Sequence, residues 1–394
     1  MVKLGRKIVK FRVPIFVLSL LLLIPSVIGY INTRVNYDVL YYLPDDIETM
    51  KGQNILVDEF GTGAYSMFVC EGMPNKDVAA LKEKIEEVEH VSQVVWYDSF
   101  ADLSLPTEML PEKIRSVLFS ENSTMMFIIF DTTTSADETM DAIGDIRKLA
   151  GKQCFVSGMS AIVTDTKNLA ESEVAIYVLI AVVLSCIVLA LAMESYLIPF
   201  LFLASIGIAI VYNMGTNIFK GEISYITKAL SAVLQLGVTM DYSIFLWHSY
   251  QEQKETYREN RKEAMAQAIA ATIKSVVGSS VTTIAGFVAL CFMSFTLGMD
   301  LGIVMAKGVV FGVLCCVTVL PAMIMIFDKP LEKTKHRQLI PDFPKVSEFL
   351  VRHHKTFAFL CVALFIPFAY FQANAKVYYN LDASLPKDLE SIMA

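Results

Sequence analysis

The chain has 394 residues, of which 55% are hydrophobic and 19% are charged, and its formal net charge is −7. About a quarter of the residues of a soluble domain are usually charged. Here the apolar residues gather into runs long enough to cross a hydrocarbon core, which takes roughly 20 residues of helix. Composition and charge therefore exclude a wholly soluble protein, and they give no reason to expect a nucleic-acid partner.

Seven apolar runs predict seven membrane helices. The runs are Val13–Ile31, Val174–Met193, Leu197–Gly215, Ile223–Trp247, Val276–Leu297, Leu301–Phe327 and Thr356–Ala373. The domain boundaries that follow are residues 1–12, 13–31, 32–173, 174–327, 328–355, 356–373 and 374–394, of which 32–173 are polar and long enough to fold on their own. We expect an α-helical polytopic membrane protein with one soluble insertion between its first and second spans.

The basic residues predict how the helices are oriented, since short cytoplasmic loops carry an excess of Lys and Arg. They gather in residues 1–12, after the fourth run and in residues 328–355, whereas only Lys220 stands clearly in a short loop on the opposite side. We therefore expect a cytoplasmic N-terminus and an extracytoplasmic insertion in a bacterial inner membrane. The first run also has the basic start of a signal peptide, but it is long for one, and the repeat described below favours a retained helix.

The insertion alternates between strand and helix patterns. Strands are expected at Tyr65–Cys70, Val94–Tyr97, Thr124–Phe130 and Gln153–Ser157, and helices at Lys76–Glu89, Met109–Phe119 and Ala136–Leu149. This β-α-β-(α)-β-α-β order is the split pattern of a ferredoxin-like α+β domain. The pattern fits two kinds of domain. One is a module that receives or passes on a substrate outside the membrane, and the other is a rigid ectodomain without a pocket.

Two of the seven cysteines lie in this insertion. In a ferredoxin-like sheet the first and fourth strands are antiparallel neighbours, which brings Cys70 and Cys154 together. A disulfide in an oxidising compartment and a pair of free buried thiols are both compatible with that placement. The other cysteines lie in apolar runs and are explained by packing, and no Cys/His spacing suggests a metal site.

Asp241 stands within the fourth run, in the sequence Gln235-Leu-Gly-Val-Thr-Met-Asp-Tyr-Ser-Ile-Phe-Leu246. A charged carboxylate near the bilayer centre costs roughly 2.5–3.5 kcal/mol on insertion scales, so such a residue marks an ion pathway by default. Tyr242 can hold a hydrogen bond across the bundle, and Gly237, one turn earlier, lets a neighbouring backbone approach closely. The alternative is a structural aspartate bonded to hydroxyl groups of an adjacent helix.

The fifth run supplies hydroxyl groups near this carboxyl. Its polar residues are Ser279, Ser280, Thr282 and Thr283. They can hydrate or bond Asp241, or they can satisfy backbone carbonyls of their own helix. Lys228 and Lys307 lie within about two turns of the outer surface, where both can snorkel, and we expect no coupling role for either.

The segment after the last run repeats the segment after the first. Residues 34–50 and 376–393 match at one constant offset of 342, which is 377 − 35. The matched pairs are Val35/Val377, Tyr37/Tyr379, Leu43/Leu385, Pro44/Pro386, Asp46/Asp388 and Glu48/Glu390. Parallel repeats are a known transporter architecture, so we expect this chain to be the truncated N-terminal half of a molecule about twice as long.

These motifs resemble the MMPL family of the RND superfamily of transporters. The resemblance lies in Gly237-Val-Thr-Met-Asp-Tyr-Ser-Ile-Phe-Leu, in Ser280-Val-Thr-Thr-Ile-Ala-Gly-Phe-Val-Ala-Leu and in Asp300-Leu-Gly-Ile-Val-Met-Ala-Lys-Gly-Val with the later Leu320-Pro-Ala. The block from Val174 to Phe327 is also similar to the sterol-sensing module of eukaryotic relatives. The Asp-Tyr pair favours the MMPL branch over the drug-efflux branch, which typically has paired aspartates there.

The resemblance implies export driven by proton entry, with Asp241 and Tyr242 as half of a relay. Protons are then the coupling ion, and no other cofactor is expected. The expected partners are membrane lipid, a hydrophobic or amphiphilic substrate, and a second transporter half that brings the matching Asp-Tyr, either a C-terminal repeat or another copy of this chain.

Two other functions fit the same residues. One is a non-transporting lipid sensor or scaffold, and the other is an accessory of protein export, since relatives of that kind share the bundle. No nucleotide-binding loop and no nucleophile constellation is present in the sequence, so neither ATP drive nor an enzyme is expected.

Overall fold

The computed structural model describes residues 1–60, 64–102, 107–258, 260–336, 344–376 and 385–393. Within these residues, seven helical segments are long and apolar enough to cross a membrane, and each predicted run overlaps one of them. They are α2 (Arg12–Asn32), α7 (Met159–Ala192), α8 (Leu197–Gly215) with the 3-10 turn η4 (Thr216–Phe219), α9 (Tyr225–Thr256), α10 (Arg261–Leu290), α11 (Leu297–Val317) with α12 (Val319–Ile326), and α15 (His354–Ala373).

Several predicted ends were wrong. Helices α7 and α10 begin fifteen residues before the apolar runs at Val174 and Val276, because hydropathy detects the membrane part and not the polar turns that continue the same helix. The fifth span ends at Leu290 rather than Leu297, since residues 291–296 form the turn into α11. Ile223 belongs to a short strand and not to the fourth helix.

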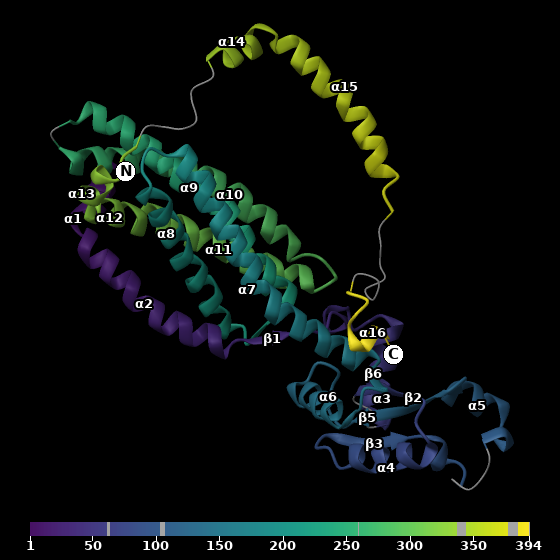
Figure 1. The fold of residues 1–394 in the computed structure, drawn as a ribbon. Coiled ribbons are helices and arrows are strands. Elements are labelled where there is room, and N and C mark those ends of the chain that lie inside the picture. The colour runs from purple at the N-terminus through teal and green to yellow at the C-terminus, as the bar shows by residue number, and fades with distance from the viewer. Residues whose placement is uncertain (61–63, 103–106, 259, 337–343, 377–384, 394) are drawn as a thin grey trace.

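The membrane helices pack around one apolar core formed mainly by α8, α9, α10, α11 and α12. The close crossings use glycine. A Cβ on Gly29 of α2 would meet the backbone of Gly215 at the end of α8, and a Cβ on Gly312 of α11 would meet Thr239 of α9. The short helix α1 (Val2–Lys10) lies against α10 at the foot of the bundle, where Arg6 pairs with Glu263. Helix α15 buries none of its residues and lies apart from the bundle (Figure 1).

The soluble domain follows α2 and contains an antiparallel sheet of order β3-β5-β2-β6, with β4 (Phe119–Ser120) paired to β5. The strands are β2 (Ala64–Glu71), β3 (Val91–Val95), β5 (Ser123–Phe130) and β6 (Cys154–Ser157), and the helices are α4 (Asn75–Glu86), α5 (Glu112–Leu118) and α6 (Asp137–Leu149). Helices α4 and α6 pack with the sheet in a second, separate core.

The second strand was predicted too late. Val94–Tyr97 was expected, but β3 ends at Val95, and Trp96 and Tyr97 leave the sheet with their side chains fully buried. The apolar pattern there reports core side chains and not strand geometry. Tyr97 instead begins the 3-10 turn η2 (Tyr97–Ser99), and a further 3-10 turn, η3, covers Thr107–Met109.

The predicted pairing of the first and fourth strands is confirmed. Cys70 of β2 lies directly opposite Cys154 of β6, with 3.6 Å between the two sulfur atoms, and both side chains are buried and free. The hydrogen bond between the thiols lowers the pKa of Cys154 to about 7 and raises the pKa of Cys70. Cys154 is therefore the thiol of the pair that ionises first.

The remaining short elements join the domain to the bundle. Strand β1 (Arg34–Asn36) pairs in parallel with β7 (Glu222–Ser224), so the end of α2 is tied to the loop between α8 and α9. The others are η1 (Leu40–Tyr42), α3 (Glu48–Phe60), α13 (Asp328–Lys333), α14 (Pro344–Arg352) and α16 (Glu390–Met393). Of the repeat positions, Val377 and Tyr379 lie outside the described residues.

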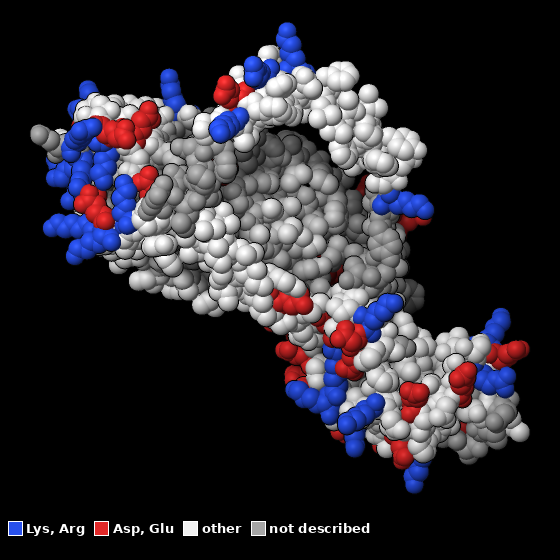
Figure 2. Space-filling view, turned by 45° about the horizontal axis from the view of Figure 1, so that its top comes forward, with Lys and Arg blue, Asp and Glu red and all other residues white. Residues whose placement is uncertain are grey.

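One helix carries the chain from the domain into the membrane. Strand β6 passes through Gly158, which has φ +93, a conformation that L side chains rarely adopt, and then becomes the 34 residues of α7. At 1.5 Å per residue this helix is about 50 Å long. The domain lies at the start of this helix, and the bundle packs along its membrane part (Figure 1). On the face shown in Figure 2, charged side chains gather on the domain and at the far end of the bundle, with a nearly uncharged belt between them.

Candidate functional site

Asp241 lies in the middle of α9. This helix starts after Ser224, whose side chain accepts a hydrogen bond from the N–H of Ile226 at 3.2 Å. Asp241 is the seventeenth of its 32 residues (241 − 225 + 1), which places the carboxyl about 24 Å from the start of the helix. That is the middle of the helix, and the place of the carboxyl near the bilayer centre stays a prediction.

The structure places Asp241 and Tyr242 on different faces of α9. Asp241 is exposed on the outside of the bundle, together with Gly237 one turn earlier and Phe245 one turn later. Tyr242 is 3% exposed and packs in the bundle core. Within the part of the chain that the structure describes, Asp241 has no hydrogen-bond or ion-pair partner. The structure therefore does not bring the two proposed relay residues into contact.

The hydroxyl groups of α10 bond their own helix. Ser280 is buried and donates to the carbonyl of Val276 at 2.5 Å, while Thr282 and Thr283 donate to the carbonyl of Ser279 at 2.7 and 3.1 Å. Ser279 is itself exposed. Among the described contacts, none joins these residues to Asp241. Three of the four hydroxyl groups bond backbone carbonyls of their own helix, which is the alternative given above for their role.

The outer face of α9 and α10 is open. A Cβ built on Gly237, Gly278 or Gly286 would meet nothing within 4 Å, whereas one on Gly308 of α11 would lie 2.7 Å from the amide nitrogen of Asn213. The glycines of α11 thus serve contacts inside the bundle, and those on the outer face leave room for another helix to approach closely.

A second carboxylate in the membrane region was missed as a site. Asp300, in the first turn of α11, is 1% exposed and pairs with Lys220 of the loop between α8 and α9. It also accepts hydrogen bonds from the N–H of Ser224 at 2.9 Å and from the hydroxyl of Thr227 at 2.5 Å. A single basic residue in a short outer loop, and an aspartate at the start of an apolar run, were the sequence signals that could have found this pair.

Lys307 is half-buried and reaches toward the turn at the outer end of α8, which is the direction in which it was expected to snorkel. Its ammonium group donates to the side-chain oxygen of Asn217 at 2.6 Å, within the bundle. Nearby, the amide of Asn213 donates to Gln235 at 3.0 Å, so α8, α9 and α11 are joined by buried polar contacts. A fixed acceptor inside the bundle holds this lysine, and hydropathy alone does not reveal that acceptor.

A pocket of about 500 Å³ lies where α2, α7, α8 and α9 meet near the domain. Its wall is mostly apolar, with Val27 of α2, Val178 of α7 and Met214 of α8 among its lining residues. Two charged side chains, Glu171 and Lys228, also line it. An apolar wall with two charged groups is a surface that suits an amphiphile.

Tyr37 contacts two other side chains at the polar end of this pocket. Its hydroxyl donates to Glu171 at 3.1 Å, and its ring stacks on Tyr225 with 5.7 Å between the ring centres. Burial, and then the neighbouring Glu171, raise the pKa of Tyr37, so the hydroxyl keeps its proton. An adjoining pocket of about 290 Å³ is also lined by Tyr37, Glu171 and Lys228. Arg34 lines both this pocket and a cleft of about 430 Å³ that borders the domain.

Within the described residues, seven helices are long and apolar enough to cross a membrane, an α+β domain follows the first of them, and an aspartate stands in the middle of the fourth. These features define a polytopic membrane protein. The sequence profile of the MMPL family matches residues 71–354. The chain therefore belongs to the MMPL family of RND-type membrane transporters.

Three relatives show how far the similarity extends. Membrane protein MJ1562 of Methanocaldococcus jannaschii is 23% identical over 357 residues, which are 80% of this chain and 91% of that protein. Membrane protein ActII-3 of Streptomyces coelicolor is 33% identical over 121 residues, 31% of this chain and 17% of its own length. Siderophore exporter MmpL5 of Mycobacterium tuberculosis is 26% identical over 266 residues, 64% of this chain and 27% of its own length. The chain thus spans most of MJ1562 and about a quarter of MmpL5.

Proposed function

We propose that this chain is the N-terminal half of an exporter that uses the proton-motive force to move lipids, amphiphiles or other hydrophobic compounds. In this proposal Asp241 takes up and releases the proton, and Tyr242 stands beside it at the same level of the membrane. Ser279, Thr282 and Thr283 of α10 form the surroundings of the relay together with Ser280 and Gly237. The chain lies in the inner membrane of a bacterial cell with its N-terminus in the cytoplasm.

The observation that carries the proposal is the place of Asp241. The carboxyl stands in the middle of a membrane span, on an open helix face, with no partner among the described residues. An unpaired charge at that depth costs roughly 2.5–3.5 kcal/mol. A second half that brings its own Asp-Tyr pair against α9 would lower this cost, because its tyrosine hydroxyl can donate to the carboxylate and its aspartate favours the protonated form of Asp241. Gly237 leaves the space for a close approach.

A proton that crosses the membrane supplies enough energy to drive a conformational cycle. Moving one elementary charge through 100 mV yields about 2.3 kcal/mol. A carboxyl that is neutral when covered by hydrocarbon and charged when it meets water favours different helix arrangements in its two states. Alternation between these arrangements is the expected coupling step.

The pocket beside α9 supports an amphiphilic substrate. Its apolar wall accepts an alkyl chain, and Glu171, Lys228 and Tyr37 stand where a polar head group leaves the hydrocarbon. The relative MmpL5 is named as a siderophore exporter, which supports export as the direction of transport. The adjoining pocket and cleft continue from this site toward the soluble domain.

We propose that the soluble domain is a ferredoxin-like porter module that receives the substrate outside the membrane. Its sheet order, with the strands in chain order 2-3-1-4 and two helices packed together against the sheet, supports this assignment. The cleft of about 430 Å³ borders the domain at Ala64 and Tyr65, which gives the substrate a place to pass from the bundle to the domain.

The test replaces Asp241 by asparagine in the native protein, purified with whatever half pairs with it and placed in proteoliposomes. The probe is a fluorescent single-chain phospholipid, which albumin outside the vesicles extracts after transport. An acidic exterior should drive extraction by the wild type and by Asp145→Asn, a control at an exposed position of the domain. We expect Asp241→Asn to lose at least roughly ten-fold of the gradient-dependent rate, about 1.4 kcal/mol. Unchanged transport refutes the relay, and unchanged transport with lost lipid binding supports a lipid sensor instead.

A further inference from the structure

The two copies of the repeat fold alike where both are described. Residues 43–51 read Leu-Pro-Asp-Asp-Ile-Glu-Thr-Met-Lys, and residues 385–393 read Leu-Pro-Lys-Asp-Leu-Glu-Ser-Ile-Met. In each copy the N–H three residues after the proline donates to the proline carbonyl, at 3.4 Å for Pro44 and 3.3 Å for Pro386. A helix then begins at the glutamate of each copy. The similarity is therefore one of backbone structure as well as sequence.

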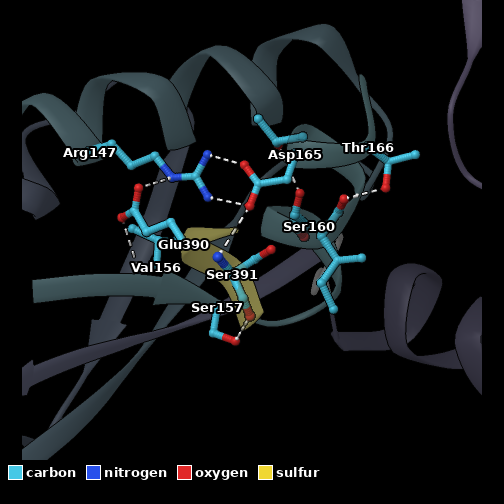
Figure 3. A network of polar contacts seen from close by, with 10 residues as sticks. Arg147, Val156, Ser157, Ser160, Asp165, Thr166, Glu390 and Ser391 are labelled. Carbon is cyan, nitrogen blue, oxygen red and sulfur yellow. Dashed lines mark hydrogen bonds and ion pairs between the residues drawn. The ribbon is translucent and has the colours of Figure 1, made fainter. Parts of the chain in front are cut away.

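The second copy is held by a charged clasp on the soluble domain (Figure 3). Arg147 of α6 donates two hydrogen bonds to Asp165 of α7, at 2.6 and 3.0 Å. The remaining guanidinium nitrogen, Nε, pairs with Glu390 of α16 at 3.1 Å. Asp165 is 6% exposed and the Glu390 side chain 31%, so one arginine meets a buried carboxylate and a partly exposed one.

The backbone of the second copy also covers the edge of the sheet. Strand β6 is an edge strand, and its Val156 N–H donates to the Glu390 carboxylate at 3.4 Å. The hydroxyl of Ser157 donates to the carbonyl of Ser391 at 2.6 Å, and the N–H of Ser391 donates to Asp165 at 3.2 Å. Exposed strand edges invite pairing with other chains, and here the second copy covers that edge.

Among the residues that the structure describes, none forms such a clasp with the first copy. Glu48 and Thr49, the equivalents of Glu390 and Ser391, are exposed and have no polar partner among the described residues. Helix α3, which they begin, buries none of the side chains that the structure describes, and its Ile55 and Leu56 are 53% and 46% exposed. The same recognition sequence is thus occupied in one copy and free in the other.

We propose that the two repeats exchange their opening segments. Residues 385–393 complete the soluble domain of the first repeat through Arg147 and Asp165, and residues 43–51 dock on an equivalent arginine–aspartate clasp in the soluble domain of the partner half. This inference rests on the proposed function, because it requires a partner half. It assigns the partner a definite surface: an edge strand that runs into a membrane helix, with an arginine from the preceding helix of the domain.

The first experiment tests the clasp in the full chain, in membranes. Ser157→Cys and Ser391→Cys are introduced together after the seven native cysteines have been replaced by alanine, and a protease site is placed between α13 and α14. After mild oxidation and cleavage, the two fragments should stay joined by a disulfide. Adding Arg147→Gln should slow cross-linking at least ten-fold, whereas Lys148→Gln, at a neighbouring side chain that is 79% exposed, should leave it unchanged. Equal rates in both variants overturn the clasp.

The second experiment tests the exchange. Residues 385–393 are replaced by the sequence of residues 43–51, with cysteine in the place of Thr49, and a scrambled nonapeptide serves as the control. The proposal expects the first-copy sequence to cross-link to Ser157→Cys within three-fold of the native rate and the scrambled sequence not to cross-link. If the first-copy sequence fails while the native one succeeds, the exchange is wrong even though the clasp stands. A cross-linked band of twice the chain mass overturns the placement of residues 385–393 on their own chain.

Neither readout depends on transport. If the first-copy sequence does not cross-link but Asp241→Asn still lowers transport, only the exchange is wrong. If it cross-links and Asp241→Asn leaves transport unchanged, only the proposed function is wrong.

Discussion

The crossing of α2 and α8 gives a sharp test of how the first span is held in the bundle. A Cβ on Gly215 would lie 2.5 Å from the Cα of Ser26 and closer still to its carbonyl oxygen, inside the 3.0 Å that real Cβ atoms keep. Because the obstacle is backbone, Gly215→Ala must move the helices apart by at least 0.5 Å (3.0 − 2.5). A gap of that size forfeits roughly a quarter of the dispersion attraction of the atom pairs it separates, and overpacking of this kind costs about 1–3 kcal/mol. Gly207→Ala on the same helix is the matched control, since its Cβ would meet nothing within 4 Å, and alanine should stabilise the helix there by about 1 kcal/mol.

Tryptophan fluorescence can follow this effect in the bundle alone. The chain has two tryptophans, Trp96 in the soluble domain and Trp247 in the bundle core. In a Trp96→Phe background, thermal unfolding of detergent-solubilised protein therefore reports on the bundle through Trp247. We expect the midpoint of Gly215→Ala to fall below the parent and that of Gly207→Ala to equal or exceed it. A Gly215→Ala midpoint at or above the parent would refute the close crossing, and with it the argument that the first apolar run is an integral part of the bundle.

Three further changes test other parts of the structure. Asp300→Asn removes the charge that pairs with Lys220 and should destabilise the bundle by about 2–4 kcal/mol. The measurement is the thermal unfolding midpoint, which should fall; an unchanged midpoint would show that the pair is dispensable. The pKa of Cys154 is lowered to about 7, so its thiolate fraction rises between about pH 6 and about pH 8, and oxidation to a disulfide with Cys70 should be faster at the higher pH. Equal rates of loss of alkylatable thiols would contradict the lowered pKa. Lys228→Ala should weaken binding of an anionic single-chain amphiphile roughly three- to ten-fold, about 0.7–1.4 kcal/mol, as measured by fluorescence titration. Binding of a zwitterionic analogue should be unaffected. Equal losses for both ligands would mean that the pocket does not distinguish head-group charge.

Most of the membrane architecture could be predicted because hydropathy reports directly on burial in lipid. All seven predicted runs meet a spanning helix. The errors occur where a helix continues beyond the membrane, as α7 does before Val174 and α10 before Val276. The polar turns there have no hydropathy signal, and only contacts with other elements, such as the hydrogen bond of Tyr37 to Glu171, show that they are ordered.

The candidate site was harder to predict because a sequence gives the type of a residue and its depth but not its direction. The depth of Asp241 follows from the apolar run, yet its exposure on the outer face depends on how α9 is rotated, which the packing of Thr239 against Gly312 of α11 helps to fix. Lys307 and Asp300 likewise find partners on other elements, Asn217 and Lys220, far from them in sequence. The offset of 342 revealed the repeat, but not that its second copy binds the first domain.

Helix α7 connects the pocket and the clasp. Asp165, near its start, belongs to the clasp that holds residues 385–393. Glu171, about two turns further on, lines the pocket, as does Val178 where the helix is already within its apolar part. Because one continuous helix carries these groups, a rotation of α7 within the membrane must move the pocket wall and the clasp together. Under the proposed function, a substrate that reshapes the pocket would therefore also act on the clasp at residues 385–393.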